Sequence, residues 1–211
     1  MRWIDVADVD MATEVYHPAV LSVYHVFGAL ELIVTHIALL RGINVGGKNP
    51  LPMKDLMRIF EAAGGRNVRT YIQSGNVMFE AAAGSSKIGE AATKSIEKQF
   101  GYRVPVILRT AEELRATIRG NPFLAKGVEH KWLHVYFLAE APSEACCASL
   151  DAKRSAPDVF EVRGREIYLH LPNGMGRTKL TNAYFDSKLS TICTARNWAT
   201  VLKLAEMMNA G

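Results

Sequence analysis

Apolar residues occur along this chain in two patterns, continuous runs and helical spacings, which alternate from His36 onward. Ile37–Leu40 is a continuous apolar run and predicts a buried central strand. In Met53–Ala63 apolar side chains recur at i, i+3, i+4 and i+7, which predicts a helix with one apolar face, and Gly64-Gly65 ends it. The same patterns predict further strands at Val68–Ile72, Val77–Phe79, Val104–Leu108, Trp132–Leu138, Asp158–Val162, Glu166–Leu171 and Ile192–Thr194. They predict further helices at Ser86–Phe100, Thr110–Arg119, Pro142–Leu150, Gly176–Leu189 and Trp198–Met208.

The order of these elements is β-α-β-β-α-β, and it occurs twice. Pro105 in the last strand of the first copy favours a sheet edge, because proline cannot donate to a central ladder. A helix opened by the capping box Thr110–Glu113 joins the two copies. We therefore predict an α+β fold of two tandem ferredoxin-like subdomains, residues 35–110 and 111–211, the second including the linker helix and a C-terminal helix.

Residues 1–34 do not follow this alternation. Their most apolar run, Ala19–Val34, is too short to span a bilayer and contains His25 and Glu31, and the segment lacks the basic start of a signal peptide. We interpret residues 1–34 as an N-terminal extension that is disordered or foreign to the natural protein, on the hypothesis that translation starts at Val34. Sequencing the N-terminus of the natural protein tests this, because a chain that begins at Met1 contradicts it.

Composition and charge narrow the class of protein. With 49% apolar and 22% charged residues, the chain is typical of a soluble globular protein. Three cysteines, two of them adjacent, exclude a disulfide framework and a C-x-x-C metal knuckle and indicate a reducing cytoplasm. Residues 1–33 hold one basic and five acidic residues, a net charge of −4, so the remainder, with 24 basic and 16 acidic residues, carries +8. Such a surface attracts nucleic acid or phosphate-bearing ligands, or is simply well solvated.

Five ordered motifs resemble one bacterial family, the domain-of-unknown-function 1697 family. The motifs are RGINVGGKN (Arg41–Asn49), TYIQSGNV (Thr70–Val77), NPF (Asn121–Phe123), YLHLPNGMGRTKL (Tyr168–Leu180) and TARNW (Thr194–Trp198). The likeness extends from about Thr35 to Met208 and leaves out the N-terminal extension. The resemblance implies the duplicated ferredoxin-like fold, and it implies no reaction.

The loop after the first strand satisfies the phosphate-binding pattern G-x-x-x-x-G-K between Gly42 and Lys48. Asn49 stands where a P-loop needs Ser or Thr for Mg²⁺, and Pro50 and Pro52 prevent a helix from starting directly at the lysine. The pattern therefore favours a tight loop that needs glycine dihedrals. A looser anion-binding nest of glycine amides with Lys48 stays open.

Cationic and amide side chains dominate the motifs, which contain no carboxylate or cysteine among their candidate ligands. General acid–base and nucleophilic chemistry need a group that titrates near neutrality, whereas cationic and amide groups suit phosphates and base edges. The sequence therefore favours binding over catalysis, and we assign no catalytic residue, no metal site and no cofactor. The candidate ligand-binding residues are Arg41, Asn44, Lys48, Asn49, Gln73, Ser74, Asn76, Asn173, Arg177, Lys179, Arg196 and Asn197.

Three functions remain open. The first is a binding module for an anionic ligand, either nucleic acid or a phosphorylated small molecule. The second is an enzyme that acts on a nucleotide-like substrate where the loops Gly42–Asn49 and Asn173–Lys179 meet, and the third is a structural or dimerising protein. Ferredoxin-like sheets also bind RNA through aromatic side chains on an open face, but no K/R-G-F/Y-G/A-F-V-x-F/Y string occurs here. No membrane partner is expected, and the sequence does not determine the oligomeric state.

Overall fold

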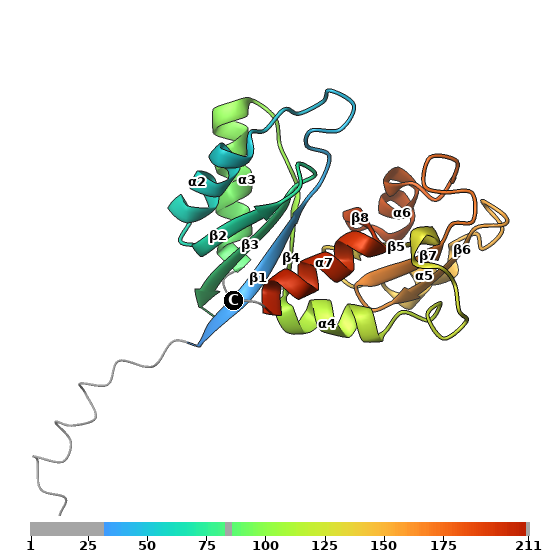
Figure 1. Cartoon of the computed structure of the whole chain (residues 1–211). Coiled ribbons are helices and arrows are strands. Elements are labelled where there is room, and N and C mark those ends of the chain that lie inside the picture. The colour runs from blue at the N-terminus through green and yellow to red at the C-terminus, as the bar shows by residue number, and fades with distance from the viewer. Residues whose placement is uncertain (1–31, 83–85, 210–211) are drawn as a thin grey trace, which may run out of the picture. The chain divides into compact units, whose positions relative to one another are not determined.

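The structure is a computed structural model that describes residues 32–82 and 86–209 (Figure 1). All but the last residues of the interpreted N-terminal extension, residues 1–34, lie outside this range. Every described helix and strand belongs to one unit that begins at Ile33. No helix in the described part of the chain is both long and apolar enough to cross a membrane.

The first half has the predicted β-α-β-β-α-β order. Its elements are β1 (Ile33–Leu40), α2 (Met53–Ala62), β2 (Arg66–Tyr71), β3 (Asn76–Ala82), α3 (Ser86–Phe100) and β4 (Val106–Thr110). The strands form an antiparallel sheet in the order β2-β3-β1-β4. β4 lies at the edge, as Pro105 predicted, although the proline directly precedes the strand and does not belong to it.

The second half repeats this order. A capped helix, α4 (Ala111–Arg119), precedes it, and its elements are the 3₁₀ turn η1 (His130–Trp132), β5 (Leu133–Leu138), α5 (Glu144–Ala148), β6 (Val159–Arg163), β7 (Glu166–His170), α6 (Asn182–Leu189), β8 (Cys193–Asn197) and the C-terminal helix α7 (Trp198–Asn209). The sheet order β6-β7-β5-β8 matches that of the first half strand for strand. The predicted α+β fold of two ferredoxin-like subdomains with a C-terminal helix is therefore confirmed.

Several element boundaries differ from the prediction, and for two of them the structure gives a clear physical reason. α6 begins at Asn182 and not at Gly176, because the Thr181 side chain accepts a hydrogen bond from Tyr184 N and caps the helix there. β8 continues beyond the predicted Thr194 to Asn197, because its residues pair with β5 over the whole length. This extension places Arg196 inside a sheet.

Three apolar clusters fill the part of the protein that the structure describes. One lies between the first sheet and α2 and α3, and a second between the other sheet and α5 and α6. The third is shared by both halves: it joins Ile37 and Met78 of the first sheet, Val135 and Tyr168 of the second, and Leu204 of α7. Figure 1 shows α4 and α7 together between the two sheets, and the two helices contact each other. The sheet faces that RNA-binding ferredoxin-like domains leave open are therefore covered here.

Candidate functional site

The loop between β1 and α2 is held in shape by its own asparagines. The Asn44 amide nitrogen donates to the carbonyls of Leu51 and Gln73, at 2.9 Å each, and its oxygen accepts from Leu51 N at 2.8 Å. Asn49 donates to the Gly42 carbonyl at 2.9 Å. Both side chains therefore stabilise the loop with the groups that a ligand would use.

Glycine dihedrals shape the same loop. Gly42, Gly46 and Gly47 have φ values of 71°, 58° and 74°, a region that costs other residues energy because of their Cβ atom. α2 begins only at Met53, five residues after Lys48, so no helix N-terminus follows the lysine directly. The predicted glycine-dependent loop is confirmed, and the arrangement is not that of a P-loop.

Arg196 in β8 crosses from the second half into the first. Its Nε donates to Asn76 Oδ1 at 2.6 Å, and Nη2 donates to the carbonyls of Leu40 and Gly75 at 2.9 and 3.0 Å. Nη1 donates to Thr194 Oγ1 at 3.0 Å and to the preceding carbonyl at 2.7 Å. Burial lowers the pKa of Arg196 to about 10, which leaves the guanidinium charged at neutral pH. We call this set of contacts the Arg196 clasp, and it uses every N–H of the side chain.

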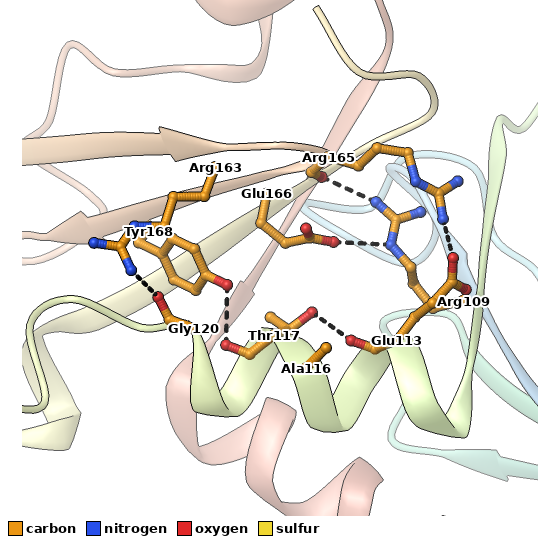
Figure 2. A pocket seen from close by; sticks show the side chains of 9 residues that line it. All are labelled: Arg109, Glu113, Ala116, Thr117, Gly120, Arg163, Arg165, Glu166 and Tyr168. Carbon is orange, nitrogen blue, oxygen red and sulfur yellow. Dashed lines mark hydrogen bonds and ion pairs between the residues drawn. The ribbon is translucent and has the colours of Figure 1, made fainter.

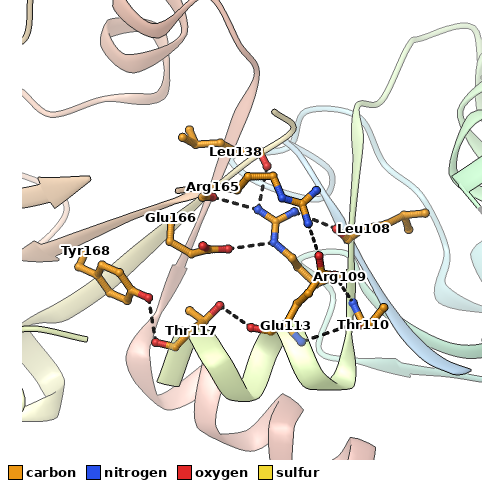
Figure 3. Close-up of polar contacts among 9 residues, drawn as sticks. All are labelled: Leu108, Arg109, Thr110, Glu113, Thr117, Leu138, Arg165, Glu166 and Tyr168. Atoms are coloured by element: carbon orange, nitrogen blue, oxygen red, sulfur yellow. Dashed lines mark hydrogen bonds and ion pairs between the residues drawn. The ribbon is translucent and has the colours of Figure 1, made fainter. Parts of the chain in front are cut away.

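Arg109 in β4 makes the reciprocal crossing from the first half into the second (Figure 3). Its Nε donates to Glu166 Oε1 at 2.9 Å, and Nη2 donates to the carbonyls of Leu138 and Arg165 at 2.8 and 2.9 Å. Nη1 donates to the carbonyl of Leu108 at 2.8 Å. Burial lowers the pKa of Arg109, and the charge of Glu166 opposes that shift. We call this set of contacts the Arg109 clasp.

The two clasps occupy equivalent places in the duplicated fold. Arg109 lies opposite Ile37 in the β1–β4 ladder, and Arg196 lies opposite Val135 in the β5–β8 ladder. Each arginine donates to two main-chain carbonyls of the other half. One belongs to the last residue of β1 or β5, and the other to the residue just before β3 or β7. The first residue of β3 or β7 accepts from Nε in both cases, and it is Asn76 in one half and Glu166 in the other.

The first predicted loop begins beside α6, the helix that follows the second predicted loop. Arg41, at the start of the β1–α2 loop, forms an ion pair with Asp186 of α6, each side chain being 26% exposed. Asp186 also accepts from Cys193 N at 2.9 Å, and Tyr136 donates to the Leu180 carbonyl at 2.9 Å, just before α6. Burial raises the pKa of the Tyr136 hydroxyl and of the Cys193 thiol, so neither provides a nucleophile at neutral pH.

The twelve predicted site residues fall into two groups. Seven make contacts within the protein: Arg41, Asn44, Asn49, Ser74, Asn76, Arg196 and Asn197. Five are exposed at the surface: Lys48, Gln73, Asn173, Arg177 and Lys179. Among the described residues, the side chains of these five have no ion pair or hydrogen bond.

A separate cavity of about 290 Å³ lies between α4 and the β6–β7 hairpin (Figure 2). In Figure 2, charged side chains from both walls point toward each other across it, and Tyr168 donates to the Thr117 carbonyl at 3.0 Å. Arg165 forms an ion pair with Glu113, and Arg163 donates to the Gly120 carbonyl at 2.9 Å. Its lining residues are Arg109, Glu113, Ala116, Thr117, Gly120, Arg163, Arg165, Glu166 and Tyr168.

Sequence reasoning missed this cavity and the partner of Arg41. Asp186 carried no signal, because nothing in the sequence pairs two residues so far apart. Arg109 did carry a sequence signal. When the two halves are aligned by their last strands, Arg109-Thr110 falls on Arg196-Asn197, and in both pairs an arginine is followed by a helix cap. No group of three or more His, Cys, Asp or Glu side chains in the described part of the chain is placed to hold a metal ion.

The fold and its paired arginines define a duplicated ferredoxin-like protein whose halves are joined through their sheets. The chain belongs to the family described as a protein of unknown function (DUF1697), whose family model matches residues 33–168. The match covers the first three motifs and ends before PNGMGRTKL and TARNW. The structure is similar to that of the conserved bacterial protein SP0830 from Streptococcus pneumoniae, with a TM-score of 0.60 and 22% identity over 83% of this chain and 99% of that one. That likeness supports the fold alone. No curated protein matches the chain.

Proposed function

We propose that the protein binds an anionic polymer, namely a nucleic acid strand, through exposed cations on its β1–α2 and β7–α6 loops. The observation that carries the proposal is the state of Lys48, Arg177 and Lys179. They are exposed, and no described carboxylate neutralises them. A cation that lacks an internal partner keeps its charge available for a phosphate.

The surroundings of these cations favour phosphate over other ligands. Asn173 is exposed on the β7–α6 loop, and Gln73 is exposed on the β2–β3 turn, whose carbonyl accepts a hydrogen bond from Asn44 of the β1–α2 loop. Both offer amide groups, which bond phosphate oxygens and base edges alike. The Arg41–Asp186 ion pair joins the start of the β1–α2 loop to α6, the helix that follows the β7–α6 loop, so a strand of several nucleotides has cations from both halves within its reach.

An extended ligand suits this surface better than an enclosed small molecule. Four cavities in the described part of the protein lie at α4 and along β4, and these loop cations line none of the four. A phosphorylated small molecule needs a concave site, whereas a strand lies across an open surface. The covered sheet faces leave loops as the surface for such contacts.

Fluorescence anisotropy with labelled single-stranded and duplex DNA and RNA tests the proposal. We expect binding at low salt with a slope of log K against log[salt] of about −2 for a single strand, since three phosphate contacts each contribute about −0.7. The triple variant Lys48→Gln, Arg177→Gln, Lys179→Gln removes most of that slope.

The matched control removes the same charge elsewhere. Lys87, Lys94 and Lys98 are exposed on α3, and their change to glutamine leaves binding largely unchanged if the loops form the site. Absence of binding to every nucleic acid, or equal loss in both triple variants, contradicts the proposal. If mononucleotides bind and nucleic acid strands do not, the result contradicts the proposal and favours a phosphorylated small molecule as the ligand.

A further inference from the structure

The two clasps differ in chemistry although they are equivalent in position. Every acceptor of Arg196 is neutral, and the residue is only 7% exposed. In the Arg109 clasp the position of Asn76 is taken by Glu166 and that of Gly75 by Arg165. Both arginines are buried, but Arg196 meets only neutral acceptors, whereas Arg109 meets the carboxylate of Glu166 and borders the cavity of Figure 2.

Two charged side chains that line this cavity, Arg165 and Glu113, are not needed for the Arg109 clasp. Arg109 binds the main-chain carbonyl of Arg165, so the Arg165 side chain is free of that task. Glu113 touches Arg165 and the cap of α4 but not Arg109. Both remain partly accessible, with 35% and 43% of their side chains exposed. They pair with each other across the cavity, so their charges line the cavity and do not hold Arg109.

Arg165 lies at the centre of a hollowed region. Besides the cavity of about 290 Å³, it lines two adjoining hollows of about 330 Å³ each, one beside Ser86 and Gly89 and one beside His36 and Glu113. A ligand therefore reaches the guanidinium from solvent without any displacement of the buried Arg109. The volume lies at the small end of the range for ligand sites.

The charges of the cavity select the class of ligand. Arg165, paired with Glu113 across the cavity, and Arg163, paired with Glu161 at its side, present guanidinium groups from the hairpin. Guanidinium groups bind carboxylates in a two-pronged geometry. Glu113 presents a carboxylate from the facing wall, α4, and Glu166 presents a second one on the hairpin itself, next to Arg165. These carboxylates attract an ammonium group and repel a simple anion. We infer that this cavity is a binding site for a small zwitterion that carries both a carboxylate and an ammonium group, such as a free α-amino acid. The site is distinct from the loop cations and does not depend on the proposed function.

Isothermal titration calorimetry with each common α-amino acid, up to about 10 mM, tests the inference. We expect saturable binding of at least one of them. Arg165→Gln and Glu113→Gln each weaken it at least about tenfold, because each removes one half of the zwitterion's partners. Both variants keep the fold: Arg165→Gln retains the carbonyl that Arg109 uses, and glutamine replaces glutamate in a capping box.

The control comes from the same helix. Arg119 and Glu112 form an exposed ion pair on α4 outside the cavity, so Arg119→Gln and Glu112→Gln leave binding unchanged. The inference is overturned if no amino acid binds, if the cavity variants bind as well as the wild type, or if acetate or phosphate binds as tightly as the amino acid. Loss of nucleic acid binding in the loop variant with amino acid binding intact separates this site from the proposed function.

Discussion

At the scale of single residues, Arg196 shows how a buried cation is tolerated without a counter-ion. Five N–H groups meet five acceptors, of which three belong to the main chain. An unpaired N–H or carbonyl at this depth costs about 1–3 kcal/mol, so the arrangement is stable only when it is complete. Asn76 in turn donates to the Tyr71 carbonyl at 3.0 Å, which fixes its oxygen toward the arginine.

Arg196→Lys is therefore not a conservative change. Lysine has three donors on a flexible stem and lacks the planar fork, so the Leu40 and Gly75 carbonyls lose their partners. We expect a loss of about 3–5 kcal/mol in the free energy of unfolding, measured by urea denaturation followed by circular dichroism. Arg58→Lys is the control, since that side chain is 77% exposed. A difference from wild type below about 0.5 kcal/mol for Arg196→Lys would show that water replaces the lost contacts.

The role of such an arginine is hard to predict from sequence. In T-A-R-N-W the cation stands next to polar residues, and nothing local indicates whether carbonyls from another half will meet it. Asn44 and Asn49 raise the same difficulty, because an amide that holds its own loop has the same residue type as one that holds a ligand. Side-chain chemistry was predictable here, but the identity of each partner was not.

At the scale of elements, most boundaries followed from local signals. The capping box at Thr110 and Glu113 starts α4 as predicted, with Glu113 N donating to Thr110 Oγ1 at 3.1 Å. The same signals do not reveal that α4 and α7 pack together between the two sheets. That arrangement depends on the apolar faces of both sheets. The residues that form these faces are far apart in the sequence, so no short segment of the chain reveals the arrangement.

The shared cluster around α7 gives an element-level prediction. Leu204 is fully buried in the cluster that joins both sheets, so Leu204→Ala leaves a cavity and costs about 2–5 kcal/mol of the free energy of unfolding. Hydrogen exchange should accelerate in β1 and in β5 alike, because both strands pack on this cluster. Glu206→Ala, on the exposed side of α7, is the control. Faster exchange confined to β5 would mean that the cluster is not shared.

At the scale of the whole molecule, each half has its own core, and yet the halves share a third. The clasps add contacts in both directions: the first half donates Arg109 and the second donates Arg196. Further bonds join the halves to the two central helices, from Arg69 to the Met207 carbonyl at 3.2 Å and from Tyr168 to the Thr117 carbonyl at 3.0 Å. Repetition of the β-α-β-β-α-β order was visible in the sequence, whereas this reciprocity was not.

Because of these shared contacts, both halves should unfold in one cooperative step. In a Trp3→Phe variant, tryptophan fluorescence follows the second half through Trp132 and Trp198, and hydrogen exchange of the β1–β3 amides follows the first. We expect both probes to give the same urea midpoint and free energy, as two-state unfolding requires. The double variant Arg109→Gln, Arg196→Gln loses both clasps, so only the shared cluster and the helix contacts still couple two halves that keep their own cores, and its two probes should diverge. Two separate transitions in the wild type would instead mean that each half is stable alone and that the arginines only set their orientation.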